Sequence, residues 1–306
     1  MKIEDAPRFD WRAFMLDESR HFYGKEAVKQ ILDQMAQLKM NIFHWHLTDD
    51  QGWRIEIKKY PKLTTIGSKR KDTQIVHWSS PKRRGEPHEG FYTQEEIKEL
   101  VTFAEARQIT IVPEIGMPGH AQAAIAAYPE LGTDPEELAV SIIFGKRYEA
   151  YNPANERVYE ILSDIIDEVI ALFPSKVIHF GGDEVRFDRW KGSKEVKALM
   201  KREGLKTYAD VQIYFTNRMS KIIEAKGRTV MGWNEILGDD LHGFGETASA
   251  ASLSKSAIIH FWKGSPELAN RAARKGHFLV NSTHAQTYLD YNWLGLEKAY
   301  SFEPIF

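Results

Sequence analysis

Short apolar segments alternate with longer amphipathic stretches along the chain, and no other sequence feature constrains the fold as strongly. We interpret the apolar segments as β-strands at residues 9–16, 41–47, 109–114, 176–180, 228–233, 257–262 and 277–281. Apolar residues at helical spacing predict helices at residues 25–38, 93–107, 155–172 and 266–275, with two more between 194 and 225. Strands that alternate with helices indicate a parallel sheet. Because no glycine-rich nucleotide fingerprint follows a strand, we predict an α/β fold of the (β/α)8 TIM-barrel type rather than a doubly wound sheet.

The length of 306 residues suits a barrel that forms one domain. No internal repeat or linker is recognisable, so residues 1–306 are expected to form a single barrel domain. We recognise no eighth strand after residue 281, and therefore expect a barrel that lacks this strand or is truncated there, with unpaired edges. Residues 58–90 are a polar insertion, and its basic run Lys82-Arg83-Arg84 is expected to be solvated.

Composition and charge exclude several classes of protein. The formal net charge is -2, whereas nucleic-acid-binding domains usually present a basic face, so no nucleic-acid partner is expected. The absence of cysteine excludes a disulfide scaffold, a thiolate nucleophile and a cysteine-bound metal. No apolar run approaches the roughly 18 residues that span a bilayer, and the first residues lack the form of a secretory signal, so we expect no membrane insertion. The 8 Trp and 12 Tyr suit sugar binding, because pyranose C–H faces stack on aromatic rings.

Acidic and aromatic residues gather just after the predicted strands. In an α/β barrel the active site lies at the carboxyl ends of the strands. The residues at these ends, in strand order from the second to the sixth, are Asp49-Asp50, Glu114 with His120 close behind, Asp183-Glu184, Trp233 and Trp262. We therefore expect the functional site at this end of the barrel.

The adjacent acids Asp183 and Glu184 are the most informative pair. Neighbouring strand residues normally point to opposite faces, but Gly181-Gly182 permits an irregular backbone that turns both acids into one pocket. Their mutual repulsion raises one pKa, so one acid can stay protonated beside a permanent anion. Cleavage of a glycosidic bond needs such a pair. The alternative is a turn with two solvated acids.

The stretch His179-Phe180-Gly181-Gly182-Asp183-Glu184 resembles the signature of the β-N-acetylhexosaminidases, glycoside hydrolase family twenty. The similarity covers nearly the whole chain. Further matching stretches are RAFMLDESRHF at 12–22, HWHLTDDQGW at 44–53, PEIGMPGH at 113–120, GWNEI at 232–236 and YLD at 288–290. We expect three departures from the family: Ala13 stands where Gly is usual, and residues 1–306 show neither a recognisable eighth strand with its Trp and Glu nor a recognisable accessory domain before the barrel.

This resemblance implies exo-hydrolysis of terminal β-linked GlcNAc or GalNAc from a glycan, with retention and without a cofactor or metal. The substrate's own acetamido oxygen would attack the anomeric carbon and form an oxazoline-type intermediate, an exception to the usual two-carboxylate scheme. Glu184 would be the general acid and base, Asp183 would orient the acetamido N–H, and Tyr288 would hydrogen-bond the acetamido oxygen. An extracytoplasmic setting follows from family habit, and oligomeric state is left open.

The resemblance also implies supporting roles. Arg12 would grip the 3- and 4-hydroxyls of the terminal sugar, and Asp290 would contact its 4- or 6-hydroxyl. Trp233 and Trp262 would wall the acetamido pocket, and Asp49 with His120 would form a relay behind Glu184. Alternatively, Arg12 pairs with a neighbouring acid, either Trp belongs to the core, and His120 is a satisfied buried histidine.

Two other functions stay open. His44 and His46 share one face of a strand, so both imidazoles could bind one metal ion, as in amidohydrolase barrels. Without the eighth strand, the chain could instead be a catalytically impaired barrel that only binds carbohydrate.

Overall fold

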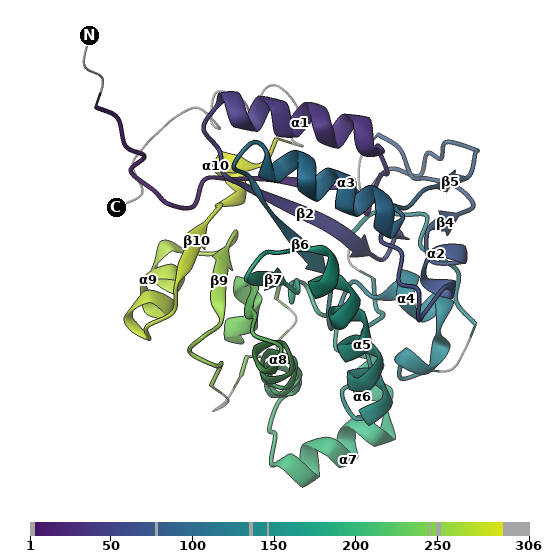
Figure 1. Cartoon of the computed structure of the whole chain (residues 1–306). Helices are drawn as coiled ribbons and strands as arrows, with labels where there is room; N and C mark the ends of the chain where they lie inside the picture. The colour runs from purple at the N-terminus through teal and green to yellow at the C-terminus, as the bar shows by residue number, and fades with distance from the viewer. Residues whose placement is uncertain are drawn as a thin grey trace.

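A curled parallel sheet forms the centre of the molecule (Figure 1). The computed structural model describes residues 4–76, 79–134, 137–145, 147–243, 245, 247–248 and 252–289. The parallel strands, in sheet order, are β1 (Ala13–Asp17), β2 (Ile42–Asp49), β6 (Thr110–Ile115), β7 (Val177–His179), β8 (Thr229–Trp233), β9 (Ile258–Phe261) and β10 (Leu279–Asn281). Short β3 (Gly52–Trp53) pairs antiparallel with β2. This order confirms the predicted α/β class and every predicted strand, although β1 begins at Ala13 and not at residue 9.

Helices follow the strands and pack on the outer face of the sheet (Figure 1). The longer helices are α1 (Lys25–Gln37), α3 (Gln94–Glu105), α5 (Glu156–Leu172), α7 (Lys194–Glu203), α8 (Tyr208–Ala225) and α9 (Pro266–Arg274). The predicted capping box starts α3, since the Thr93 side chain accepts from Glu96 N and the Glu96 carboxylate accepts from Thr93 N. Helix α1 contacts α3, and α5 contacts α8. In the part of the chain that is described, no helix has the length and apolarity to cross a bilayer.

The insertion between β3 and α3 is folded onto the barrel. It carries α2 (Lys62–Thr65) and a two-stranded sheet of β4 (Lys69–Arg70) and β5 (His88–Glu89). The buried Arg54 guanidinium donates to the carbonyl oxygens of Ser68 and Gly90, at 2.8 and 2.9 Å, and so ties the residues on either side of the β4–β5 pair to the residue after β3. The short elements after β6 are α4 (Gln122–Ala127), α6 (Asp188–Gly192), α10 (His284–Thr287) and the 3-10 turns Pro129–Leu131 and Asn234–Leu237.

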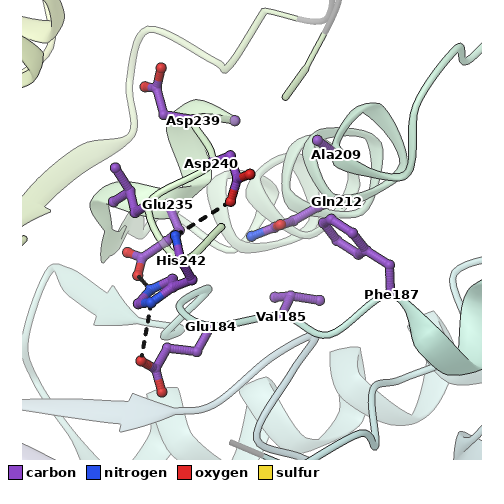
Figure 2. Close-up of a pocket in the computed structure, with 11 residues that line it drawn as sticks. Glu184, Val185, Phe187, Ala209, Gln212, Glu235, Asp239, Asp240 and His242 are labelled. Atoms are coloured by element: carbon purple, nitrogen blue, oxygen red, sulfur yellow. Dashed lines mark hydrogen bonds and ion pairs between the residues drawn. The ribbon is translucent and has the colours of Figure 1, made fainter. Parts of the chain in front are cut away.

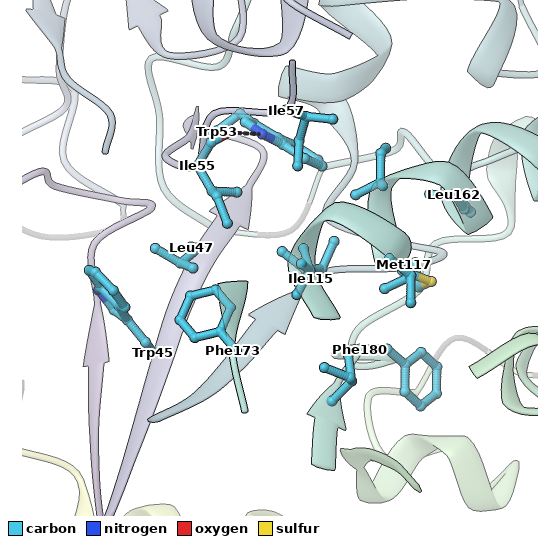
Figure 3. Packing of buried hydrophobic residues seen from close by; sticks show 14 of the residues in the cluster. Trp45, Leu47, Trp53, Ile55, Ile57, Ile115, Met117, Leu162, Phe173 and Phe180 are labelled. Atoms are coloured by element: carbon cyan, nitrogen blue, oxygen red, sulfur yellow. Dashed lines mark hydrogen bonds between the residues drawn. The ribbon is translucent and has the colours of Figure 1, made fainter. Parts of the chain in front are cut away.

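Both faces of β2 are buried, but one carries apolar side chains and the other carries polar ones. Trp45 and Leu47 lie in the apolar core between sheet and helices, where Phe173 packs beside them (Figure 3). The alternate residues His44 and His46 point to the concave side, where they approach carboxylates of β6 and β2. The interior of the curl is therefore polar, and it opens at the carboxyl ends of the strands.

Within the described residues the sheet order runs from β1 to β10 without closing, as expected for a barrel without an eighth strand. The basic run Lys82-Arg83-Arg84 is exposed, as predicted.

Candidate active site

The turn after β7 brings Asp183 and Glu184 to one imidazole. Gly181 and Gly182 adopt φ of 74° and 90°, and Glu184 itself has φ 49°. His120 Nε2 lies 3.4 Å from Asp183 Oδ2 and 3.8 Å from Glu184 Oε2. Both carboxyls are partly exposed, at 20% and 17% of their side-chain areas, so they can reach a ligand as well as the protein.

The glycines are required by the packing of this turn as well as by its backbone. A Cβ on Gly182 would lie 2.4 Å from Ile236 Cγ2, and one on Gly232 of β8 would lie 2.7 Å from Phe180 Cε1. Only a residue without a side chain fits between β7 and the segment after β8. The close approach of these two segments fixes where Asp183 and Glu184 stand.

His120 lies at the head of a chain of charged groups. Its Nδ1 is 3.1 Å from Asp49 Oδ1 and 3.1 Å from Asp50 Oδ2. Burial alone would lower the pKa of His120, but the charges of Asp49 and Asp183 raise it well above its ordinary value. The sequence placed Asp50 at the same strand end but assigned roles only to Asp49 and His120; Asp50 also accepts the Gln122 N–H at 3.0 Å.

Arg12 is not in this site, which corrects the sequence-based assignment. It precedes β1 at the amino end of the strand, and its guanidinium donates to the carbonyl oxygens of Lys39 and Phe9 at 2.6 Å each. The site lies at the opposite, carboxyl ends of the strands. The assignment came from the resemblance of residues 12–22 to the family, and this stretch contains both Arg12, before β1, and Arg20, after it.

Arg20 occupies the place that Arg12 was expected to fill. It follows the carboxyl end of β1, and its Nη2 lies 2.8 Å from Asp49 Oδ2 while Nη1 lies 2.8 Å from Asp17 Oδ2. Burial of Asp49 would raise its pKa, but Arg20, followed by His120, holds the pKa well below the usual range. The position of Arg20 after a strand was the available sequence signal.

Trp233 ends β8 and Trp262 directly follows the adjacent strand β9, and their rings are 6.3 Å apart at 69°. Trp233 is buried, and its Nε1 donates to Glu114 Oε1 at 3.0 Å. The more exposed Trp262 stacks with Tyr288, with ring centroids 6.0 Å apart and planes 13° apart. The structure therefore joins Tyr288 to the aromatic pair, whereas the predicted Asp290 lies outside the described residues.

A small hollow that opens to solvent lies beside Glu184 (Figure 2). Its walls include Glu184, Val185, Phe187, Gln212, Glu235 and His242. Burial raises the pKa of Glu235, against the hydrogen bond from His242 Nε2 at 2.8 Å, which lowers it. Neither residue was identified from the sequence. Glu235 lies two residues after the end of β8 in GWNEI, which was a usable signal. No strand precedes His242 closely enough to indicate its place.

Donor groups suited to a metal ion occur at several places inside the curl. Among the described side chains, the groups of three or more are His44 with His179 and His260, Asp49 with Asp50 and His120, and His120 with Asp183 and Glu184. None of these groups contains the pair of His44 with His46. Both of those imidazoles face Glu114 Oε2, at 2.7 and 3.9 Å. The prediction that the site uses no metal stays a prediction.

A barrel with paired acids at the carboxyl ends of its strands is typical of glycoside hydrolases. The model of the glycosyl hydrolase family 20 catalytic domain matches residues 9–302. The chain therefore belongs to glycosyl hydrolase family 20, as its sequence motifs predicted.

The relatives agree with this assignment. A beta-hexosaminidase of Porphyromonas gingivalis is 38% identical over 318 residues, which cover 100% of this chain and 38% of the relative. A beta-hexosaminidase of Vibrio furnissii is 38% identical, with 99% of this chain and 50% of the relative covered. A crystal structure of an exo beta-N-acetylglucosaminidase from Vibrio harveyi in complex with N-acetylglucosamine has a TM-score of 0.81 and 37% identity, covering 98% of this chain and 47% of that one. The chain thus spans half or less of the length of these relatives.

Proposed function

We propose that the chain hydrolyses terminal, non-reducing β-linked N-acetylhexosamine by substrate-assisted, retaining catalysis. The observation that carries this proposal is the convergence of Asp183 and Glu184 on His120, at 3.4 and 3.8 Å, at the carboxyl ends of the strands. The family relationship supports the same activity, since the relatives are hexosaminidases by name. Glycans that end in GlcNAc or GalNAc are the expected substrates.

The first step needs a proton donor and an internal nucleophile. The acetamido oxygen of the substrate attacks the anomeric carbon while Glu184 gives its proton to the glycosidic oxygen, which leaves as an alcohol. Asp183 accepts a hydrogen bond from the acetamido N–H and offsets the positive charge that develops on the oxazoline ring. This stabilisation accelerates the reaction because it is stronger in the transition state than in the ground state.

In the second step water attacks the anomeric carbon and gives a proton to the Glu184 carboxylate. The oxazoline ring reopens to the acetamide, and two inversions produce net retention. Asp183 must stay ionised throughout, and the raised pKa of His120 keeps a positive charge 3.4 Å from it. We assign Tyr288 to the acetamido oxygen and Trp262 to a wall of the acetamido pocket.

We further propose that Arg20, and not Arg12, grips the hydroxyls of the terminal sugar. Its guanidinium is 26% exposed at the carboxyl end of β1 and is held by Asp17 and Asp49, so its remaining N–H donors have a fixed direction.

The decisive experiment compares an aryl N-acetyl-β-glucosaminide with the matching aryl β-glucoside. Only the first has the internal nucleophile, so we expect cleavage of the first alone, and equal rates on both would refute the acetamido role. Glu184→Gln should impair substrates with poor leaving groups most, whereas Asp183→Asn should impair good and poor leaving groups alike.

The same assay separates the alternative functions. Binding of N-acetylglucosamine without turnover of either aryl glycoside would favour a carbohydrate-binding barrel. Activity that disappears with a chelator and returns with added metal would favour the His44 and His46 metal site instead.

A further inference from the structure

We propose that His284 is a positioning residue that holds Tyr288 and Trp262 in one fixed arrangement, and that it thereby sets how closely the site selects the N-acyl group of the substrate. The inference rests on the proposed function, because that function places Tyr288 at the acetamido oxygen and Trp262 at a wall of the acetamido pocket. It adds a residue that acts through these two aromatic side chains and not on the substrate itself.

His284 holds the backbone of Trp262 with two hydrogen bonds. Its backbone N–H donates to the Trp262 carbonyl oxygen at 2.9 Å, and its ring Nδ1 lies 3.2 Å from the same oxygen. A carbonyl oxygen can only accept, so Nδ1 carries a hydrogen and donates it. The two donors of His284 therefore use both lone pairs of this carbonyl group, which lies just past the end of β9.

Trp262 is held from the side of β8 as well. Asn234 Oδ1 accepts the Trp262 N–H at 3.0 Å, and Asn234 Nδ2 donates to the Lys263 carbonyl oxygen at 2.9 Å. The Glu235 carboxylate accepts from Trp262 Nε1, at 3.1 and 2.9 Å. These contacts fix the indole N–H and the backbone from one side, and His284 fixes the backbone from the side of β10.

The same histidine begins the turn that carries Tyr288. Helix α10 starts at His284, and the Tyr288 N–H donates to the His284 carbonyl oxygen at 3.2 Å. The imidazole is nearly perpendicular to both aromatic rings, at 71° and 5.7 Å between centroids for Trp262 and at 82° and 6.1 Å for Tyr288. His284 thus contacts both members of the stacked pair, through its backbone and through its ring.

Two parts of the proposed acetamido site therefore depend on one anchor. Tyr288 places the acetamido oxygen in line with the anomeric carbon, and a displacement of about 1 Å in such a geometry costs roughly 10²-fold in rate. Trp262 limits the space around the acetamido group, and one added methylene in a pocket changes kcat/KM by roughly 10–200-fold. Loss of the anchor should lower the rate on the N-acetyl substrate and weaken the discrimination against a larger N-acyl group.

Three replacements of His284 separate its contacts. His284→Asn keeps a donor near the place of Nδ1 but removes the ring, whereas His284→Phe keeps a ring but removes the donor. His284→Ala removes both, and all three variants keep the backbone N–H and carbonyl groups. Gln286→Ala is the matched control, because Gln286 is an exposed residue of the same helix.

The readout is kcat/KM for one aryl β-glucosaminide with an N-acetyl group and for the same glycoside with an N-propionyl group. We expect the wild type to prefer the N-acetyl substrate by roughly 10–200-fold, and His284→Ala to lower this preference roughly tenfold. The kcat of His284→Ala on the N-acetyl substrate should also fall roughly tenfold, less than the cost of a full 1 Å displacement. His284→Asn and His284→Phe should lie between the wild type and His284→Ala, and Gln286→Ala should match the wild type.

The preference separates positioning from a merely structural role, because a loss of folded protein lowers both rates equally and leaves their ratio unchanged. A His284→Ala preference equal to that of the wild type would overturn the proposal, as would an equal change in Gln286→Ala. If His284→Ala does not fold, an unchanged preference in both the Asn and the Phe variants has the same meaning. Failure of the proposed function is seen separately, because it would appear in the wild type as equal cleavage of the glucosaminide and the glucoside.

Discussion

Gly182→Ala tests whether the turn that presents the two acids depends on a residue without a side chain. Gly182 has φ 90°, and an alanine in this left-handed region costs roughly 1–2 kcal/mol. Its Cβ would also lie 2.4 Å from Ile236 Cγ2, far inside the contact distance of about 3.5–4.0 Å, and such overpacking costs roughly 1–3 kcal/mol. We therefore expect the free energy of unfolding to fall by roughly 2–5 kcal/mol.

Gly204→Ala is the matched control for the backbone cost. Gly204 follows α7 with φ 68°, and a Cβ there would meet nothing within 4 Å, so only the left-handed penalty of roughly 1–2 kcal/mol applies. Urea denaturation gives the free energy of unfolding of both variants, provided that the slope m of the transition is the same as in the wild type. The double variant Gly182→Ala with Ile236→Ala completes a double-mutant cycle. Because removal of the Ile236 side chain relieves the clash, we expect the double variant to be roughly 1–3 kcal/mol more stable than the sum of the two single effects predicts.

The same variant links the turn to the proposed chemistry. Since the clash pushes the backbone before Asp183 and Glu184, we expect folded Gly182→Ala to lose roughly 10²-fold in kcat, as for a displacement of about 1 Å. If Gly182→Ala is no less stable than Gly204→Ala, or if its rate is unchanged, the close approach of the β7 turn to Ile236 does not position the acids.

Three further outcomes are expected. Arg20→Ala should raise KM or lower kcat/KM by at least tenfold, a loss of about 1.4 kcal/mol, while Arg12→Ala leaves steady-state kinetics within twofold; the reverse order would restore the original assignment. Burial alone would lower the pKa of His46, but carboxylates led by Glu114 raise it from 6.5 to about 9. His46 therefore adds roughly 3 kcal/mol to the free energy of unfolding at pH values below its unfolded pKa, and this contribution is lost as the pH rises from about 6.5 to 9. In His46→Gln the midpoint of urea denaturation should therefore depend less on pH across this window. A pH dependence equal to that of the wild type would contradict the ionic role. Replacing residues 82–84 by alanine should change stability by less than about 0.5 kcal/mol, because all three are exposed. A larger loss in thermal denaturation would show that exposed contacts such as the Arg84–Glu86 ion pair contribute more than this.

The strand pattern was predictable because the central strands β2, β6, β7, β8 and β9 are largely buried on both faces and the helices between them are amphipathic. Residues 228–233 and 257–262 coincide closely with β8 and β9. The start of β1 was not predictable, since Phe9, at 64% exposure, has the apolar character of a strand residue without its burial. Propensity reports what a residue prefers, whereas the end of a strand depends on where pairing with β2 begins, at Ala13.

The candidate site was predictable where it depends on strand ends. Asp49, His120, Asp183 and Glu184 follow or lie near the carboxyl ends of strands, so the barrel geometry alone predicts that they meet. His242 was not predictable, because it comes from a loop whose path depends on contacts with Glu184 and other residues distant in sequence.

Glu114 links the positions of the strands that carry the candidate site. Its carboxylate lies within 4 Å of nitrogens from three other strands, namely His44 and His46 of β2, His179 of β7 and Trp233 of β8. Burial alone would raise its pKa, yet the charges of His179 and His46 hold the pKa well below the ordinary value. A buried carboxylate is tolerated only when such partners stay in place, so a shift of any one strand would leave an unpaired buried charge, which costs several kcal/mol. The register of β2, β6, β7 and β8 is thereby coupled to the positions of the acids at their carboxyl ends. The polar interior of the sheet therefore helps to position Asp183 and Glu184.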